Sequence, residues 1–146
     1  MNAPFESRSG YRGYVGARPI FGNRTPQHVQ NIVIREYAAR HRLAYKLSAT
    51  EYAMPSSYIM LQQVLGELPR LEGVILYSMF MLPQRPDVRA SIYETFRRTG
   101  AILHAAVEGL AIRDADDARR FEDIWRVQQV MARGTLRGDD ISHLSL

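Results

Sequence analysis

Short apolar runs that alternate with longer segments of helical periodicity restrict the fold of this chain more than any other feature. The run "GVILYS" (73–78) is uninterrupted, as in a strand that is covered on both faces of its sheet. Further strands are predicted at 10–17 ("GYRGYVGA"), 43–48 ("LAYKLS") and 101–108 ("AILHAAVE"). Helical segments separate these runs, and this order favours parallel strands joined by right-handed crossovers.

Capping residues and the spacing of apolar side chains predict four helices. The first helix is expected to have Thr25 as its cap and Pro26 as its first residue, and the second to have Ser56 or Ser57 as its cap and to stop at Pro69. The third is expected from Asp87 to Gly100, and the fourth over 113–134.

A chain of 146 residues is long enough to bury one full core. The sequence therefore predicts a single three-layer α/β sandwich of flavodoxin-like kind, with a parallel sheet of four or five strands. We expect a flexible N-terminal arm at 1–10, the α/β domain at 11–132 and a C-terminal tail at 133–146.

The composition excludes several classes of site. There are no cysteines, which rules out disulfides, thiolate zinc sites and cysteine nucleophiles. No second ligand stands at metal spacing from His104, which is expected to be a satisfied core histidine, so neither a metal nor another cofactor is predicted. No apolar segment has the length of a signal peptide or a membrane span, and a cytoplasmic protein without membrane contact is expected.

The net charge of +4 does not by itself indicate nucleic-acid binding. Eighteen arginines and one lysine are scattered among acidic residues along the helices, rather than gathered in a basic stripe. We therefore expect no nucleic-acid partner.

The loop after the first predicted strand carries more cations and amides than a turn requires. Ligands of open parallel sheets bind beyond the carboxyl ends of the strands, and a helix start there adds free N–H groups. An anion site is therefore predicted at Arg18, Asn23, Arg24 and Thr25. The alternative is that Arg18 and Arg24 are ordinary surface arginines paired with carboxylates.

Proton-transfer groups are predicted in the same set of loops. Glu51 follows the second strand and is the most plausible general acid or base, assisted by His28, Tyr52 or Ser78. Each of these residues also has a structural interpretation. Glu51 could cap or brace its own loop, and a histidine near a helix start is more often exposed or capping than catalytic.

The order of elements over roughly 11–130 resembles the catalytic domain of serine recombinases (resolvases), which makes a resolvase-like layout the alternative to a flavodoxin-like one. That family has a nucleophilic serine after its first strand and arginines after its third. Here those places read Gly16, Ala17, Arg18 and Met79, Phe80, Met81, so the resemblance does not extend to recombination chemistry.

At the level of short words, "PQHVQN", "SATEYAMP" and "LYSMFMLP" are similar to the sporadic carbohydrate cluster proteins. This resemblance implies a setting in carbohydrate or surface polysaccharide biosynthesis and carries no catalytic residues with it. The segment "GARPIF" also resembles nucleoside deoxyribosyltransferase-type domains, in which a helix glutamate is the nucleophile. Glu94 is its only rough counterpart here.

Two functions are therefore open. The first is a small enzyme that acts by acid–base chemistry on a sugar phosphate or nucleotide-linked sugar, and the second is a non-catalytic protein that binds such a ligand or a partner enzyme. Trp125, Val127, Val130 and Met131 place apolar side chains on more than one face of the last helix. A homo-oligomer formed through that helix is expected.

Overall fold

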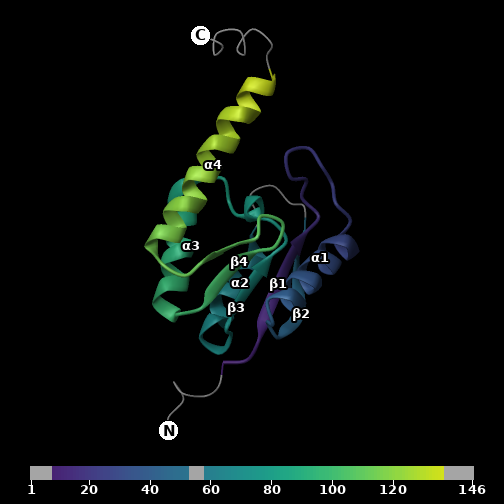
Figure 1. The fold of residues 1–146 in the computed structure, drawn as a ribbon, viewed down its shortest axis with the longest axis vertical. Coiled ribbons are helices and arrows are strands. Elements are labelled where there is room, and N and C mark those ends of the chain that lie inside the picture. The colour runs from purple at the N-terminus through teal and green to yellow at the C-terminus, as the bar shows by residue number, and fades with distance from the viewer. Residues whose placement is uncertain (1–7, 53–57, 137–146) are drawn as a thin grey trace.

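The computed structural model describes residues 8–52 and 58–136, and it contains one mixed sheet in the order β2-β1-β3-β4-β5 (Figure 1). The strands are β1 (Tyr11–Gly16), β2 (Tyr45–Glu51), β3 (Gly73–Leu76), β4 (Ile102–Ala105) and β5 (Leu110–Ile112). The first four are parallel, as predicted, whereas β5 is antiparallel to β4. The α/β class is thus confirmed, and an all-parallel sheet is wrong for the fifth strand.

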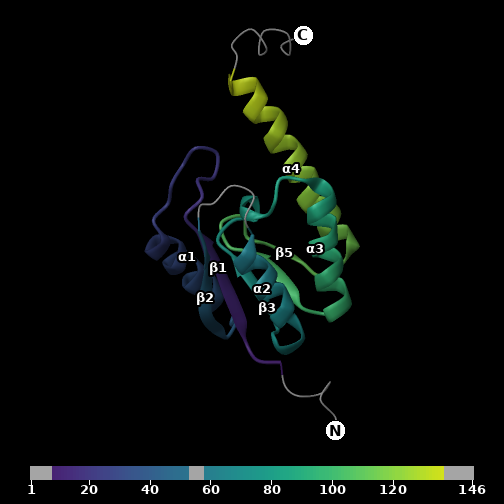
Figure 2. The same cartoon turned by 180° about the vertical axis from the view of Figure 1, so that it is seen from behind.

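Four α-helices pack against this sheet within the described residues. They are α1 (Gln27–Arg40), α2 (Ile59–Glu67), α3 (Pro86–Thr99) and α4 (Ala115–Leu136), with short 3₁₀ turns at Leu68–Arg70 and Met79–Met81. Helix α1 lies on one face, and α2, α3 and α4 lie on the other (Figures 1 and 2). This arrangement is compatible with the predicted three layers.

The two faces of the sheet bury different sets of side chains because successive residues of a strand point in opposite directions. Val15 and Ile75 pack under α1 with Ile34. Tyr14 and Leu76 point to the other face, where the larger part of the core gathers under α2, α3 and α4.

The reversal before β5 explains why the predicted strand 101–108 is too long. The chain leaves β4 at Ala105 and turns, and Gly109 adopts a φ of 66° while its N–H donates to Ala105 O at 2.9 Å. A positive φ costs glycine little, so the chain can double back within four residues. β5 then pairs beside β4 before α4 begins.

The helix boundaries agree with the predictions in part. Gly100 ends α3 with a φ of 75°, as the sequence indicates, although α3 begins at Pro86 rather than at Asp87. The predicted caps Ser56 and Ser57 lie outside the described residues. Helix α4 continues to Leu136, past the Gly134 that marks its predicted end.

Thr25 does not cap α1, which is a correction to the prediction. Pro26 occupies the N-cap position, and within the described part of the chain no side chain caps the helix. The buried Gln30 holds this junction instead, because its amide donates to Gly16 O and Thr25 O, both at 2.8 Å, and accepts from Gly16 N at 3.0 Å. The carboxyl end of β1 is therefore bound to α1 through one side chain.

Candidate functional site

Two adjoining cavities lie where the parallel strands end. The first, here called the aromatic recess, has a volume of about 80 Å³ and includes Phe21, Tyr58, Phe80, Trp125, Tyr14 and Glu51 in its lining. The second, the α2–α3 groove, has a volume of about 790 Å³ and includes Gln62 and Leu65 of α2 and Val88 and Ser91 of α3. Arg18, Tyr58 and Gln84 line both, so they mark the junction of the two cavities.

Arg18 is held at this junction by the end of β1 and by an aromatic ring. The strand finishes at Gly16, and the half-buried Arg18 side chain places its guanidinium carbon 4.3 Å from the centre of the Tyr58 ring. A guanidinium carries its N–H donors along its edges, in a fork that matches phosphate or carboxylate oxygens. Arg18, the predicted anion ligand, lies at the junction of the two cavities.

Glu51 lines the same recess, and its carboxylate is bound on several sides. Its side chain is buried and accepts hydrogen bonds from Tyr14 OH (2.7 Å), Leu61 N (3.1 Å) and Met60 N (3.2 Å). The two N–H groups belong to the first turn of α2, where a negative charge is favourable. Burial and the Glu51 carboxylate together raise the pKa of Tyr14 well above its usual value. Glu51 thus stabilises the start of α2 from the end of β2.

A tight turn shapes the loop that carries the other predicted anion ligands. Ile20 and Asn23 exchange backbone hydrogen bonds at 2.9 Å, and Phe21 and Gly22 between them have φ values of 51° and 80°. Two positive φ values in succession are typical of a type I′ turn, which accounts for the glycine at position 22. The Phe21 ring then contacts Phe80, which contacts Trp125 of α4.

The structure brings together only some of the predicted site residues. Asn23, Arg24 and His28 are exposed, and they line neither the aromatic recess nor the α2–α3 groove. Thr25 instead accepts a long hydrogen bond from Tyr77 OH (3.4 Å). Of the four anion ligands predicted, Arg18 is the one that shares a cavity with Glu51.

The remaining two proton-transfer candidates line neither the aromatic recess nor the α2–α3 groove. Tyr52 is 69% exposed. Ser78 is buried and donates to Glu108 (2.7 Å), whose other carboxylate oxygen accepts from Met79 N (2.9 Å). Ser78 and Glu108 therefore form a separate pair that fixes the loop after β3.

Arg89 is a buried residue at this end of the molecule that the sequence analysis missed. Its guanidinium forms a two-point ion pair with Glu122 of α4, with both distances 2.8 Å, and donates to Pro83 O (3.0 Å) and Gln84 O (2.8 Å). It also stacks 4.1 Å from the Trp125 ring. Arg89 stands one turn before Ile92 and Tyr93 on the inner face of α3, and that spacing is the signal that could have revealed it.

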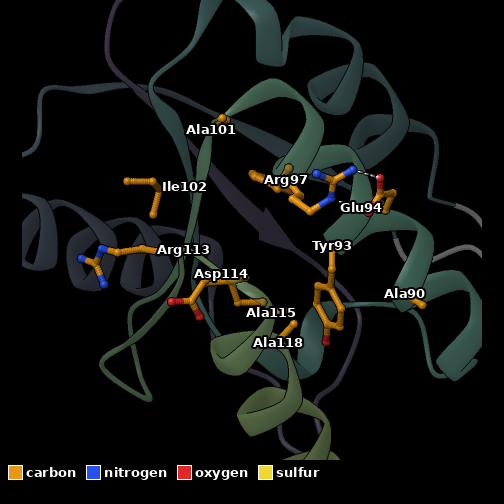
Figure 3. Close-up of a pocket in the computed structure, with 13 residues that line it drawn as sticks. Ala90, Tyr93, Glu94, Arg97, Ala101, Ile102, Arg113, Asp114, Ala115 and Ala118 are labelled. Atoms are coloured by element: carbon orange, nitrogen blue, oxygen red, sulfur yellow. Dashed lines mark hydrogen bonds and ion pairs between the residues drawn. The ribbon is translucent and has the colours of Figure 1, made fainter.

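A third cavity lies at the opposite edge of the sheet, between α3, β5 and the start of α4. It has a volume of about 310 Å³. Figure 3 shows the Tyr93 ring directed toward Ala115 and Ala118, the ion pair of Arg97 with Glu94 on the α3 side, and Arg113 extending away on the other side. Its polar groups are already paired in part, and none of the predicted acid–base or anion ligands lines it.

His104 occupies the face of β4 that packs toward α1. It is buried, and its Nδ1 shares a hydrogen bond of 2.7 Å with Tyr37 OH, while Nε2 has no hydrogen-bond partner among the described residues. Burial, with the positive charges of Arg113 and His41, lowers the pKa of His104 to about 4. The expected core position is thus correct, and hydrogen bonding satisfies one ring nitrogen rather than both.

No protein-family model, curated protein or solved structure matches this chain. Among residues 8–52 and 58–136, no group of three or more histidine or carboxylate side chains is arranged to hold a metal ion. In the same part of the chain, no helix combines the length and the apolar character that a membrane span needs.

Proposed function

We propose that this protein binds a phosphorylated or nucleotide-linked sugar at the junction of the aromatic recess and the α2–α3 groove. The observation that carries this proposal is the position of Arg18, which lines both cavities beside the buried Glu51. A guanidinium donates to phosphate oxygens in a two-point geometry, whereas the nearby carboxylate accepts from neutral hydroxyl groups. The pair suits a ligand that has both an anionic and a hydroxyl-rich part.

The lining of the two cavities supports the same class of ligand. Gln62, Gln84 and Ser91 supply amide and hydroxyl groups along the α2–α3 groove. Phe80 and Trp125 supply flat apolar surfaces in the aromatic recess. A few polar groups set in an apolar wall are typical of small-molecule sites. The carbohydrate part of the proposal rests on the short words that resemble the sporadic carbohydrate cluster proteins.

The proposed function has a catalytic form and a non-catalytic form. In the first, Glu51 transfers a proton to or from the bound sugar, which requires one of its hydrogen bonds to give way to the substrate. In the second, the protein binds without turnover. The three hydrogen bonds that Glu51 accepts within the fold favour the second form, as do the separate positions of Ser78 and His28.

The finer description of the fold is part of the proposal. The strand order β2-β1-β3-β4-β5 is the order found in flavodoxin-like sheets, and the antiparallel β5 is the departure from it. The strand order reverses between β1 and β3, because β2 lies on one side of β1 and β3 on the other, and Arg18 follows β1 at this point. A cytoplasmic location and the lack of a nucleic-acid partner stay predictions.

Calorimetric titration with UDP-glucose, glucose 1-phosphate and unphosphorylated glucose tests the proposal. We expect the wild-type protein to bind one of the phosphorylated compounds and not glucose, because a guanidinium donates in pairs to phosphate oxygens, which glucose lacks. Arg18→Ala should weaken this binding at least tenfold, while the matched variant Arg24→Ala should change it less than twofold. Binding that is unaffected by Arg18→Ala, or no binding of either phosphorylated compound, would contradict the proposal.

Turnover separates the two forms once a ligand has been found. The bound sugar phosphate is incubated with the wild-type protein and with Glu51→Gln, and the products are followed by NMR. Conversion by the wild type that is lost in a folded Glu51→Gln variant supports acid–base catalysis. Unchanged ligand in both samples supports the non-catalytic form.

A further inference from the structure

The two halves of α4 have different surroundings. In the first half, Phe121 and Trp125 are buried in the core under the sheet. The second half runs away from the rest of the molecule, beyond the edge where the parallel strands end (Figures 1 and 2). There Val127, Val130 and Met131 are 59%, 56% and 58% exposed. A helix that projects in this way normally turns polar side chains outward.

The exposed apolar side chains form one stripe. Positions 127, 130 and 131 are three and four residues apart, so they share a helix face, and Ile124 extends that face by one turn toward the body. Gln128, one turn after the partly buried Ile124 and the buried Trp125, is half-buried, so an amide lies nearer the body than Val127, Val130 and Met131 do. This arrangement is the reverse of a solvated helix, and it indicates that the outer face of α4 is covered in the working protein.

The charges along this stripe favour a second copy of the same chain. Between 124 and 132 the one charged residue is Arg126, and its guanidinium is paired with Asp123 on the same helix. A two-fold related copy can therefore bring an identical stripe against this one without placing like charges together. The spacing of 124, 127 and 131 is also the spacing of a helix–helix seam.

We propose that two copies of this protein pair through the outer face of α4, with Val127, Val130 and Met131 at the contact. With Ile124 the stripe spans about two helical turns, and it is smaller than the roughly 800 Å² per partner of a standard stable interface. The dimer is therefore expected to be weak, with dissociation in the micromolar range. This inference is independent of the ligand proposed above.

Sedimentation equilibrium of the full chain from about 1 to 300 µM tests the pairing. We expect the mass to rise with concentration toward twice the chain mass of 16.7 kDa. Val127→Glu should raise the dissociation constant at least tenfold, because it places two charges against each other at the contact. Leu47→Glu is the matched control, since Leu47 is 81% exposed on the edge strand β2 and should leave the constant within twofold.

Three outcomes would overturn the proposal. One is a monomer at every concentration, which is also the result expected if another part of the same chain covers the stripe. Another is an association that Val127→Glu leaves intact while circular dichroism shows the variant to be folded. The third is an equal loss of association in Leu47→Glu, which would show a general effect of added charge.

Discussion

Two sets of Arg, Glu and Tyr side chains stand on the same side of the sheet and differ in what surrounds them. In the first, Arg89 pairs with Glu122, which also accepts a hydrogen bond from Tyr93 OH at 2.6 Å. In the second, Glu51 accepts from Tyr14 OH at 2.7 Å, and Arg18 lines the same recess. Both guanidinium groups stack on an aromatic ring.

The two guanidinium groups differ in their burial and in the groups that surround them. Arg89 is 2% exposed, and its donors are taken up by one carboxylate and two carbonyl groups. Burial works to lower the pKa of Arg89, but the hydrogen bonds and charge of Glu122 outweigh burial and raise it. Arg18 is half-buried at a cavity wall, and the carboxylate beside it is bound to backbone N–H groups of α2. The same chemistry therefore joins helices in one place and faces a cavity in the other.

The largest expected effect comes from Arg89→Ala. Removal of this guanidinium leaves Glu122 partly buried without its counter-charge and frees the carbonyls of Pro83 and Gln84. Loss of one partner from a buried ion pair typically costs about 3–5 kcal/mol. We expect a fall of that size in the free energy of unfolding, measured by urea denaturation.

Arg85→Ala is the matched control for this prediction. Arg85 lies four residues earlier and pairs with Asp87, but both side chains are exposed. Exposed ion pairs contribute little to stability because solvent screens them, so this variant should be close to wild type. Equal losses in the two variants would remove the basis for treating the Arg89 set as structural.

Stability in acid also separates the two sets, and His104 contributes to it first. The pKa of His104 is about 4 in the folded chain, whereas its ordinary value, which applies to the unfolded chain, is 6.5. As the pH falls, the unfolded state therefore binds the proton before the folded state does. Stability from this group is therefore complete above pH 6.5 and falls as the pH drops toward 4. At about 1.4 kcal/mol per pKa unit, the loss is about 3 kcal/mol.

Unfolding free energies at pH 7, 6, 5 and 4.5 check this dependence. The wild type should lose stability through the series, and His104→Asn, whatever its starting stability, should show a much flatter profile. Below pH 4.5, outside this series, the Glu122 set adds its own acid sensitivity, because hydrogen bonds from Arg89 and Tyr93 outweigh burial and lower the pKa of Glu122. Parallel slopes in the two proteins would show that His104 does not titrate in this range.

The sequence was sufficient for the parts of the fold that depend on local pattern. The uninterrupted apolar run at 73–78 predicted β3, because a strand that is buried on both faces needs apolar residues throughout. Gly100 predicted the end of α3, because the positive φ at that position favours glycine. The reversal into β5 was missed because Gly109 looks like any glycine within an apolar stretch. The bend shows itself only in the folded chain, where Gly109 N donates to Ala105 O and β5 pairs with β4.

The candidate site was predictable to the extent that it follows strand ends. Arg18 and Glu51 were placed at the same edge because β1 and β2 are parallel neighbours, and Gly16 and Glu51 are in register. The hydrogen-bond partners that lie far away in the sequence could not be predicted from strand ends. Gln30 and Arg89 are polar residues on helices, and their roles are set by backbone groups that only the folded chain brings within reach.

The smallest of these effects tests whether the Glu51 set is also structural. Tyr14→Phe removes one hydrogen bond to the carboxylate and leaves both N–H groups of α2 in place. A loss of about 1 kcal/mol is expected, because the remaining donors still satisfy a buried charge. Glu51→Gln should cost more, about 1–3 kcal/mol, since it removes the charge at the helix start and turns amide hydrogens toward N–H donors. Urea denaturation measures both. If Glu51→Gln is as stable as wild type, the carboxylate is not needed to begin α2, and its hydrogen bonds are free to be exchanged for a ligand, which would restore proton transfer as the better account of this residue.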